Sequence, residues 1–406
     1  MNPNNHIEQL IHDLCPSGVP QKTLGEVCHL KRGRGLSKND IVPTSAGTLP
    51  IILYGELYTA YSGHIKEIKS SAVKEKAILG TEARISDLLL PISSTTKEAQ
   101  IGCAADLLID KTIYVGGDAI VLSHHQNPGY LVYYINSARF EKEKMACVSG
   151  TTIRHLSPTK LMQISIPLPP LPIQEEIVRI LDTFTELITN IDTEIKEQQK
   201  LFTKLLNSFY DTNTQRVPIA ALGNIIRGRR FTRTDIVEQG IPCIHYGDIY
   251  TKYSICVSKA LTYLIGDITK RMRYAQSGDV VYVGAGENDE DIGMAIAWLG
   301  KEPVAVHDAC YILSKHEQNA KYLAYVSRAN NFHHQLRMSV AMGKICSIPP
   351  DGLGRVKIPL PSLAEQNRIV KQLETIEALI TNLKTERDLR QQQYEYYREK
   401  LINLLK

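Results

Sequence analysis

A heptad pattern that occurs twice constrains this chain more than any other feature. Each copy follows a proline-rich run, Ile-Pro-Leu-Pro-Pro-Leu at 166–171 and Ile-Pro-Leu-Pro-Ser-Leu at 358–363, so the copies stand 192 residues apart. Apolar residues then recur at alternating steps of four and three, which predicts coiled-coil helices of about 40 residues and roughly 60 Å each. They are Ile177, Leu181, Phe184, Ile188, Ile191, Ile195, Phe202, Leu205 and Phe209 in the first copy, and Ile369, Leu373, Ile376, Ile380, Leu383, Tyr394, Tyr397, Leu401 and Leu404 in the second.

Two matching seams in one chain most simply pack on each other. The segments between them join the end of one helix to the start of the other, which predicts an antiparallel, intramolecular coiled coil. The alternative that stays open is a pair of long core helices inside one large domain.

The composition sets wide limits on the function. A chain of 406 residues suggests two or three domains. The eight cysteines are scattered, with no C-x-x-C pair, so we expect free thiols, a cytoplasmic location and neither a zinc site nor a redox site. No apolar run approaches ~18 residues, so no membrane span is expected. The net charge of +4 is compatible with nucleic-acid binding but is too small to indicate it.

The segments before the two helical patterns are themselves related. Short β-prone runs alternate there with Gly, Pro, Asn and Ser, which is typical of mixed α/β domains, and 130–140 is predicted to be helical. Residues 50–59 (PIILYGELYT) match residues 242–251 (PCIHYGDIYT), again 192 residues apart. The chain is therefore interpreted as a tandem duplication of a domain followed by a helix.

The duplication also predicts a circular arrangement. Ile7 and Ile11, followed by Val19, resemble Leu205 and Phe209, followed by Val217. The short N-terminal helix therefore resembles the end of a long helix whose body lies at the other terminus. We expect an α+β chain with pseudo-two-fold symmetry, organised as an N-terminal domain with its short helix (1–165), a first spacer helix (166–212), a C-terminal domain (213–357) and a second spacer helix (358–406).

Motifs for catalysis are weak. Gly284-Ala285-Gly286 follows an apolar run, but the helix start that a nucleotide-binding loop needs does not follow it. Asn127-Pro128-Gly129-Tyr130 is better explained as a turn leading into a helix than as a methyltransferase motif. We expect no catalytic residues, no cofactor and no metal.

Basic clusters recur at equivalent places in the two copies. Lys31, Arg32 and Arg34 follow a β-prone run in the first domain, as Arg227, Arg229 and Arg230 do in the second. Arginine on glycine-containing loops suits contacts with phosphates and with guanine edges, although a charge cluster is often only a solvated face. The further candidates for DNA contact are Tyr54, Lys97, Thr152, Arg154, His245, Tyr246, Arg271, Arg273 and Lys344.

The chain resembles the specificity subunit of type I restriction-modification systems. The resemblance covers the whole length and is carried by the two proline-rich runs, by Gln174 with 177–182 (IVRILD), by Glu365-Gln366, and by the tail 393–401 (QYEYYREKL). The first copy departs from the usual pattern in having Pro172-Ile173 where the second has Ala364-Glu365.

The resemblance implies a division of labour. Each mixed domain would be a target recognition domain that reads one half of a bipartite, asymmetric site in double-stranded DNA. The helices would set the spacing of the half-sites and dock two methyltransferase subunits, and restriction subunits, which translocate and cut DNA, would join them. The specificity subunit itself would be non-catalytic.

Two other functions compete with this one. The first is a methyltransferase with its own recognition domains, which would bind S-adenosylmethionine as the isolated chain. The second is a coiled-coil scaffold, which would show no salt-dependent binding to duplex DNA.

Overall fold

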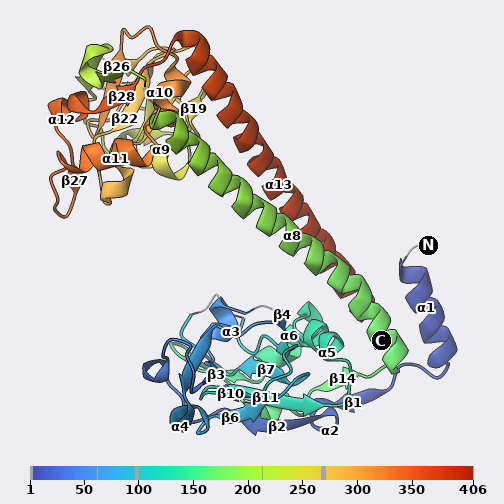
Figure 1. Cartoon of the computed structure of the whole chain (residues 1–406). Helices are drawn as coiled ribbons and strands as arrows, with labels where there is room; N and C mark the ends of the chain where they lie inside the picture. Colours follow the sequence, from blue (N-terminus) through green and yellow to red (C-terminus); the bar gives the residue numbers. More distant parts are fainter. Residues whose placement is uncertain (1–2, 62, 97–99, 213, 267–270, 406) are drawn as a thin grey trace. The chain divides into compact units, whose positions relative to one another are not determined.

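The computed structural model describes residues 3–61, 63–96, 100–212, 214–266 and 271–405. The chain divides into two compact units, unit 1 (Met1–Asn190 with Glu386–Lys406) and unit 2 (Ile191–Thr385). Each unit contains a part of both long helices, α8 (Leu171–Tyr210) and α13 (Leu363–Asn403), as Figure 1 shows. Both units are α+β, as the sequence predicted.

Unit 1 is built on two main sheets. The five-stranded sheet has the order β2 (Cys28–Arg32), β11 (Ala119–His124), β7 (Leu88–Pro91), β9 (Ala105–Leu107), β4 (Gly63–Ile65). The four-stranded sheet has the order β5 (Ser70–Val73), β3 (Thr48–Ile52), β10 (Ile113–Val115), β6 (Thr81–Ala83). Smaller sheets join β1 (Gln21–Thr23) to β14 (Ser165–Pro167), and β12 (Val148–Ser149) to β13 (Arg154–Leu156) and β8 (Ser93–Ser94). The helices are α1 (Pro3–Leu14), α2 (Leu24–Val27), α3 (Glu56–Thr59), α4 (Lys74–Ala77), α5 (Pro128–Ile135), α6 (Ala138–Met145) and α7 (Pro158–Leu161).

Unit 2 repeats this plan. Its first sheet has the order β16 (Asn224–Arg227), β26 (Cys310–Ser314), β22 (Val280–Val283), β24 (Ala295–Trp298), β19 (Cys256–Val257). Its second has the order β17 (Ile236–Val237), β20 (Thr262–Leu264), β18 (Ile241–Ile244), β25 (Val304–Val306), β21 (Tyr274–Ala275). The small sheets join β15 (Arg216–Pro218) to β28 (Lys357–Pro359), and β23 (Ala285–Gly286) to β27 (Cys346–Ser347). The helices are α9 (Tyr246–Thr251), α10 (Ala320–Val326), α11 (Asn330–Arg337) and α12 (Pro350–Arg355).

The parallel strand pairs identify the duplication in three dimensions. In unit 1, β4 runs parallel to β9 and β3 runs parallel to β10. In unit 2, β19 runs parallel to β24 and β18 runs parallel to β25. The other strand pairs described in these sheets are antiparallel, including β2 with β11 and β16 with β26. The two units therefore share the order and direction of the main strands, with β17 as an additional edge strand in unit 2, which supports the tandem duplication.

The long helices pack against each other in opposite directions. In unit 1 the start of α8 shares a buried apolar cluster with the end of α13, and Phe184 stacks on Tyr397 with ring centroids 5.3 Å apart. In unit 2 the end of α8 shares a cluster with the start of α13. The residues are Ile173, Ile177, Leu181, Leu401 and Ile402 in unit 1, and Leu206, Tyr210, Ile369, Val370 and Leu373 in unit 2. This is the antiparallel pairing that the two seams predicted.

A buried glutamine joins each mixed domain to its long helix. Gln174 of α8 accepts a hydrogen bond from the backbone N–H of Asn127 (3.0 Å) and donates to the carbonyl of Pro169 (2.7 Å). Gln366 of α13 does the same with Asn319 (3.0 Å) and Pro361 (2.9 Å). Both glutamines are fully buried, so these bonds replace water as their partners.

The Asn-Pro-Gly-Tyr motif is a helix start, as the sequence analysis expected. The side chain of Asn127 accepts from the N–H of Tyr130 (3.2 Å), and Pro128 occupies the first turn of α5. Residues 130–140, predicted as helical, form parts of two helices rather than one. The side chain of Ser137 accepts from the N–H of Phe140 (3.3 Å) and so begins α6.

The N-terminal helix α1 packs with the other end of the chain. Ile7 is fully buried in the cluster that holds Leu401, Ile402 and Leu405. Among the described residues, no helix is both long and apolar enough to cross a membrane.

Candidate nucleic-acid interface

The predicted basic clusters form equivalent loops, which we call the basic loops (32–34 and 227–230). In unit 1 the N–H of Gly33 donates to Ala119 (2.8 Å) and that of Arg34 donates to Val115 (3.3 Å). In unit 2 the N–H of Gly228 donates to Cys310 and that of Arg229 donates to Val306, both at 2.9 Å. The same backbone bonds therefore hold both loops.

Glycine is required in each basic loop because the backbone passes close to a second segment. A Cβ atom at Gly33 would lie 1.9 Å from the carbonyl oxygen of Gly116, and one at Gly228 would lie 2.1 Å from that of His307. We call these second segments the turn loops (116–118 and 307–309). The close approach fixes the backbone of the basic loop, so the flanking arginines project from a defined position.

The arginines of unit 2 are held unequally. Arg227 donates from Nε to the carbonyl of Asp308 (2.7 Å), and Arg273 donates from Nη1 to the carbonyl of Arg227 (2.6 Å). Arg229 and Arg230 are exposed, as are Lys31, Arg32 and Arg34 in unit 1. The structure therefore brings Arg227 and Arg273 together and leaves Arg229 and Arg230 facing solvent.

Beside this basic loop lies a cluster of aromatic rings. The His307 ring lies 4.8 Å from Phe231, 4.7 Å from His245 and 5.5 Å from Tyr246, measured between centroids. Burial lowers the pKa of both histidines, and the charge of His307 further lowers that of His245. Both ring nitrogens of His307 already have partners: Nδ1 accepts from the N–H of Ala309 (3.1 Å), and Nε2 lies 3.1 Å from the carbonyl oxygen of Phe231. Nδ1 of His245 accepts from the N–H of Gly247 (3.3 Å).

Unit 1 has a different chemistry at the same place. Leu53 and Tyr54 stand where unit 2 has His245 and Tyr246. Tyr54 is half-buried, and nearby Tyr58 donates from its hydroxyl to the carbonyl of Ser93 (3.0 Å). The two units thus share backbone geometry but differ in the side chains that surround the basic loop.

A third pair of loops borders the turn loops. We call them the hairpin loops (150–154 and 342–346); they contain Thr152, Arg154 and Lys344. In unit 1 Leu156 donates to Ile92 (2.8 Å), which in turn donates to Asp118 (2.8 Å) through its own N–H. Thr152 and Lys344 are exposed, and Arg154 donates from Nη2 to the sulfur of Met145 (3.2 Å).

Unit 2 supports its hairpin loop through the same chain of backbone bonds. Ile348 donates to Gly284 (2.9 Å), and Gly284 donates to Ala309 (2.7 Å). In each unit the basic loop rests on the turn loop, and one intermediate residue, Ile92 or Gly284, links the turn loop to the strand that follows the hairpin loop. Gly284, considered above as part of a nucleotide-binding motif, has this structural role.

Some predicted residues remain apart from this group, and others were missed. Arg271 is exposed, and no described hydrogen bond joins it to the basic loop. Lys97 lies outside the described residues. Sequence reasoning missed His307 and Phe231; only the position of Phe231 directly after the basic cluster could have suggested it.

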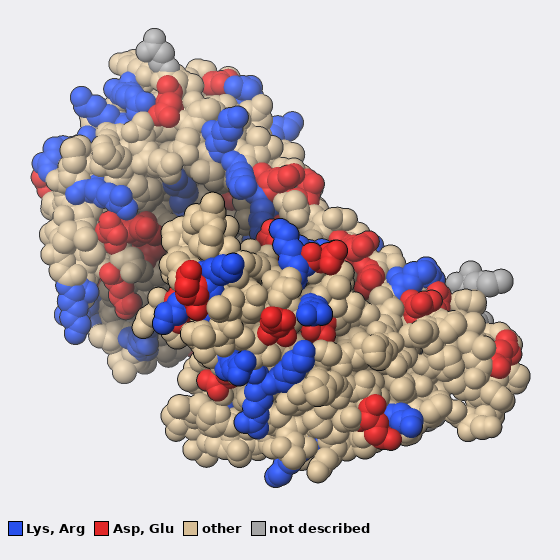
Figure 2. Space-filling view, turned by 60° about the horizontal axis from the view of Figure 1, so that its bottom comes forward, with Lys and Arg blue, Asp and Glu red and all other residues tan. Residues whose placement is uncertain are grey.

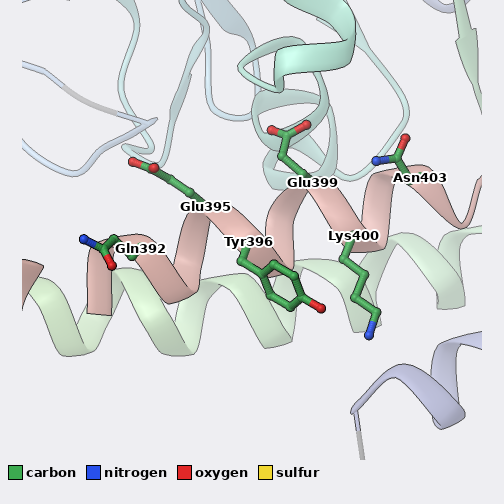
Figure 3. A pocket seen from close by; sticks show the side chains of 6 residues that line it. All are labelled: Gln392, Glu395, Tyr396, Glu399, Lys400 and Asn403. Atoms are coloured by element: carbon green, nitrogen blue, oxygen red, sulfur yellow. The ribbon is translucent and has the colours of Figure 1, made fainter. Parts of the chain in front are cut away.

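The face of the molecule that Figure 2 shows carries side chains of both charges. Figure 2 shows Lys and Arg interspersed with Asp and Glu over the face in view. A shallow depression of about 580 Å³ lies along α13, with Glu395 and Glu399 projecting to one side and Tyr396 and Lys400 to the other (Figure 3). Within the described part of the chain, no cluster of three or more His, Cys, Asp or Glu residues is arranged to hold a metal ion.

Two similar α+β units, each with an arginine-bearing loop and with a part of both long helices, define a duplicated protein. The model of the family described as type I restriction modification DNA specificity domain matches residues 16–199 and again residues 213–390. The chain therefore belongs to the type I restriction-modification specificity family, as the resemblance indicated.

Individual relatives and solved structures agree with this assignment. A Haemophilus influenzae protein assigned as the type I restriction enzyme specificity subunit S.HindORF215P is 27% identical over 296 residues, which are 68% of this chain and 72% of that protein. The EcoR124I/EcoR124II specificity subunit of Escherichia coli is 28% identical over 264 residues, 60% of this chain and 64% of that one.

Two solved structures share the fold. One is a chain from work on complex assembly and conformational transition of the type I R-M system, with a TM-score of 0.61 at 17% identity, covering 96% of this chain and 98% of that one. The other is the S subunit from M. genitalium, with a TM-score of 0.52 at 13% identity, covering 94% and 95%. The family model and the relatives, rather than the fold, make the chain a non-catalytic specificity subunit, as the resemblance implied.

Proposed function

We infer that this chain reads DNA for a type I restriction-modification complex, with each mixed domain recognising one half of a bipartite, asymmetric site. The observation that carries the proposal is the recurrence of three neighbouring loops in both units, with the same backbone bonds and different side chains. Two units that share a loop backbone but differ in side chains can recognise two different half-sites with the same docking geometry.

The remaining parts of the complex follow from the same proposal. Residues 1–165 and 213–357 are the recognition domains, and the helices in 166–212 and 358–406 space them and dock two methyltransferase subunits. Restriction subunits join that assembly in the cytoplasm. This part of the proposal rests on the membership of the chain in the type I restriction-modification specificity family.

Removing the two exposed arginines of unit 2 tests the proposal. The full chain with its methyltransferase partner carries Arg229→Ala and Arg230→Ala, and duplex DNA affinity is measured at several salt concentrations. Each phosphate contact contributes about 0.9 to the slope of log K against log salt, so we expect the slope to fall by roughly 2 if both residues bind phosphates.

The matched control removes the same charge elsewhere in unit 2. Lys259→Ala with Lys301→Ala deletes two exposed cations near the end of the sheet where β22 begins, whereas the basic loop lies toward the end where β22 finishes. Equal losses in the two double variants would show that only net charge matters and would contradict the proposed interface. Absence of salt-dependent binding by the unaltered complex would favour the scaffold function instead.

A further inference from the structure

The two hairpin loops have the same length and the same closure. In unit 1, Ser149 pairs with His155 in an antiparallel register, and five residues lie between them (Gly-Thr-Thr-Ile-Arg). In unit 2, Ala341 forms an antiparallel bridge with Ser347, again around five residues (Met-Gly-Lys-Ile-Cys). Isoleucine at the fourth position, Ile153 or Ile345, is the one residue identical at equivalent places in the two loops.

Both isoleucines are exposed although the core is close. Ile153 is 49% exposed and Ile345 is 64% exposed, whereas Leu156 and Ile348, three residues later, are each 2% exposed. Exposed apolar side chains are common on protein surfaces, so exposure alone carries no conclusion. The same side chain exposed at the same position of two otherwise different loops requires a reason other than packing in the core.

The surroundings of the isoleucines indicate what they meet. One basic residue is adjacent to each isoleucine in the sequence: Arg154 follows Ile153, and Lys344 precedes Ile345. The strand that follows each hairpin loop is also linked, through Ile92 or Gly284, to the turn loop on which the basic loop rests. An apolar side chain next to a basic one suits a partner such as duplex DNA, which has phosphates along its backbone and apolar groups on base edges in its grooves.

The loops are also held in place before any partner binds. A Cβ atom at Gly150, where φ is +94°, would lie 2.0 Å from the carbonyl oxygen of Ile153, so the backbone turns tightly there. In unit 2, Ala341 and Ser347 exchange two backbone bonds of 2.8 and 3.1 Å. A fixed backbone lowers the conformational entropy that the loop would lose on contact with a partner.

Resting on the proposed function, we propose that Ile153 and Ile345 each contact the C5-methyl group of a thymine in the half-site read by their own unit. Thymine is the base that presents an apolar group in the major groove, and aliphatic side chains contact it there. Both isoleucines are thus specificity-determining residues, which act beside the arginines that bind phosphates or guanines.

The test uses the full chain with its methyltransferase partner and the site mapped from the methylation it produces. Ile345→Ala lowers cognate affinity roughly fourfold, the effect of about one lost methyl contact, and leaves the salt slope and the affinity for non-cognate DNA unchanged. Replacing one thymine of that half-site by uracil removes the methyl group and has the same effect on the unaltered protein. Ile153→Ala behaves likewise on the other half-site.

Combining the two changes identifies the contact. The uracil that weakens binding by the unaltered protein has no further effect on the Ile345→Ala protein if the two groups touch. Leu261→Ala and Ile85→Ala serve as controls, because they truncate side chains outside the three loops that are 54% and 48% exposed. In these variants the uracil substitution should weaken binding as much as it does in the unaltered protein. Unchanged thermal unfolding of each variant establishes that its fold is intact.

The outcomes separate this inference from the proposed function. If the complex binds its site in a salt-dependent way but every uracil substitution is additive with Ile345→Ala and Ile153→Ala, the thymine contact is wrong and the DNA-reading function stands. If the unaltered complex does not distinguish the mapped site from other duplex DNA, the proposed function itself fails.

Discussion

At the scale of single residues, His64 joins the body of unit 1 to α8. Its Nδ1 lies 2.8 Å from Oδ1 of Asp106, and its Nε2 lies 3.4 Å from Oδ1 of Asp182. Tyr133 donates to the same oxygen of Asp182 at 2.6 Å. Burial acts to lower the pKa of His64, but the hydrogen bonds and charges of the two aspartates outweigh it and raise the pKa to about 9.

This contact predicts how stability changes with pH. Because the folded pKa lies above the ordinary value of 6.5, the contribution of His64 is complete below pH 6.5 and is lost as the pH rises toward 9. His64→Gln should lower the unfolding free energy more at pH 6 than at high pH, by at most ~3 kcal/mol, and this pH-dependent part should vanish by about pH 10. Chemical denaturation across this pH range measures it, with the exposed His125→Gln as control. A constant difference between the proteins would contradict the ion pairs.

The sequence predicted those candidate residues that are adjacent to one another in the chain. The basic loops could be predicted because arginine and glycine stand together in each copy. His307 and His64 could not, because strand pairing far along the chain brings them to their partners. His307 reaches His245 through the parallel pair β18 and β25, and His64 reaches Asp106 through the parallel pair β4 and β9.

At the scale of elements, the buried glutamines make the attachment of α8 and α13 testable. Gln366→Leu keeps the volume but leaves the N–H of Asn319 and the carbonyl of Pro361 without this partner. We expect a loss of about 1–3 kcal/mol, since buried polar groups are left unsatisfied. Hydrogen exchange at Asn319 should accelerate, and Gln372→Leu at an exposed site of the same helix should leave it unchanged. Unaltered exchange in the Gln366 variant would show that water replaces the bond freely.

The long helices were the most predictable elements because their heptad pattern is continuous and occurs twice. The strands of the mixed domains were less predictable from the sequence. Many have only two to four residues, as in β8, β19 and β23, and such runs carry too little alternation to define a register. The order of strands in the sheets could not be obtained from the sequence at all, because it depends on non-local pairing.

At the scale of the whole molecule, the duplicated design predicts that recognition is modular. Val217 pairs with Ile358, so the two ends of the segment 217–357 are adjacent partners in the antiparallel sheet of β15 and β28. Adjacent ends allow this segment to be replaced by that of a relative without altering the separation of the flanking helices. Mapping methylation by the hybrid complex should show one half-site changed and the other kept. Changes in both half-sites would mean that the domains do not read independently.

The main-chain support of the basic loops has a consequence for how new specificities arise. Hydrogen bonds from backbone N–H groups and the absence of a Cβ atom at Gly33 and Gly228 hold the path of each loop. In unit 2 the side chains of Arg227 and Arg273 add bonds to this support, and neither residue is among the positions to be randomised. A combinatorial library that keeps these two glycines and randomises positions 32, 34, 229 and 230 should therefore consist mostly of folded proteins. Selection in such a library would act on the choice of bases, with little loss of variants to misfolding.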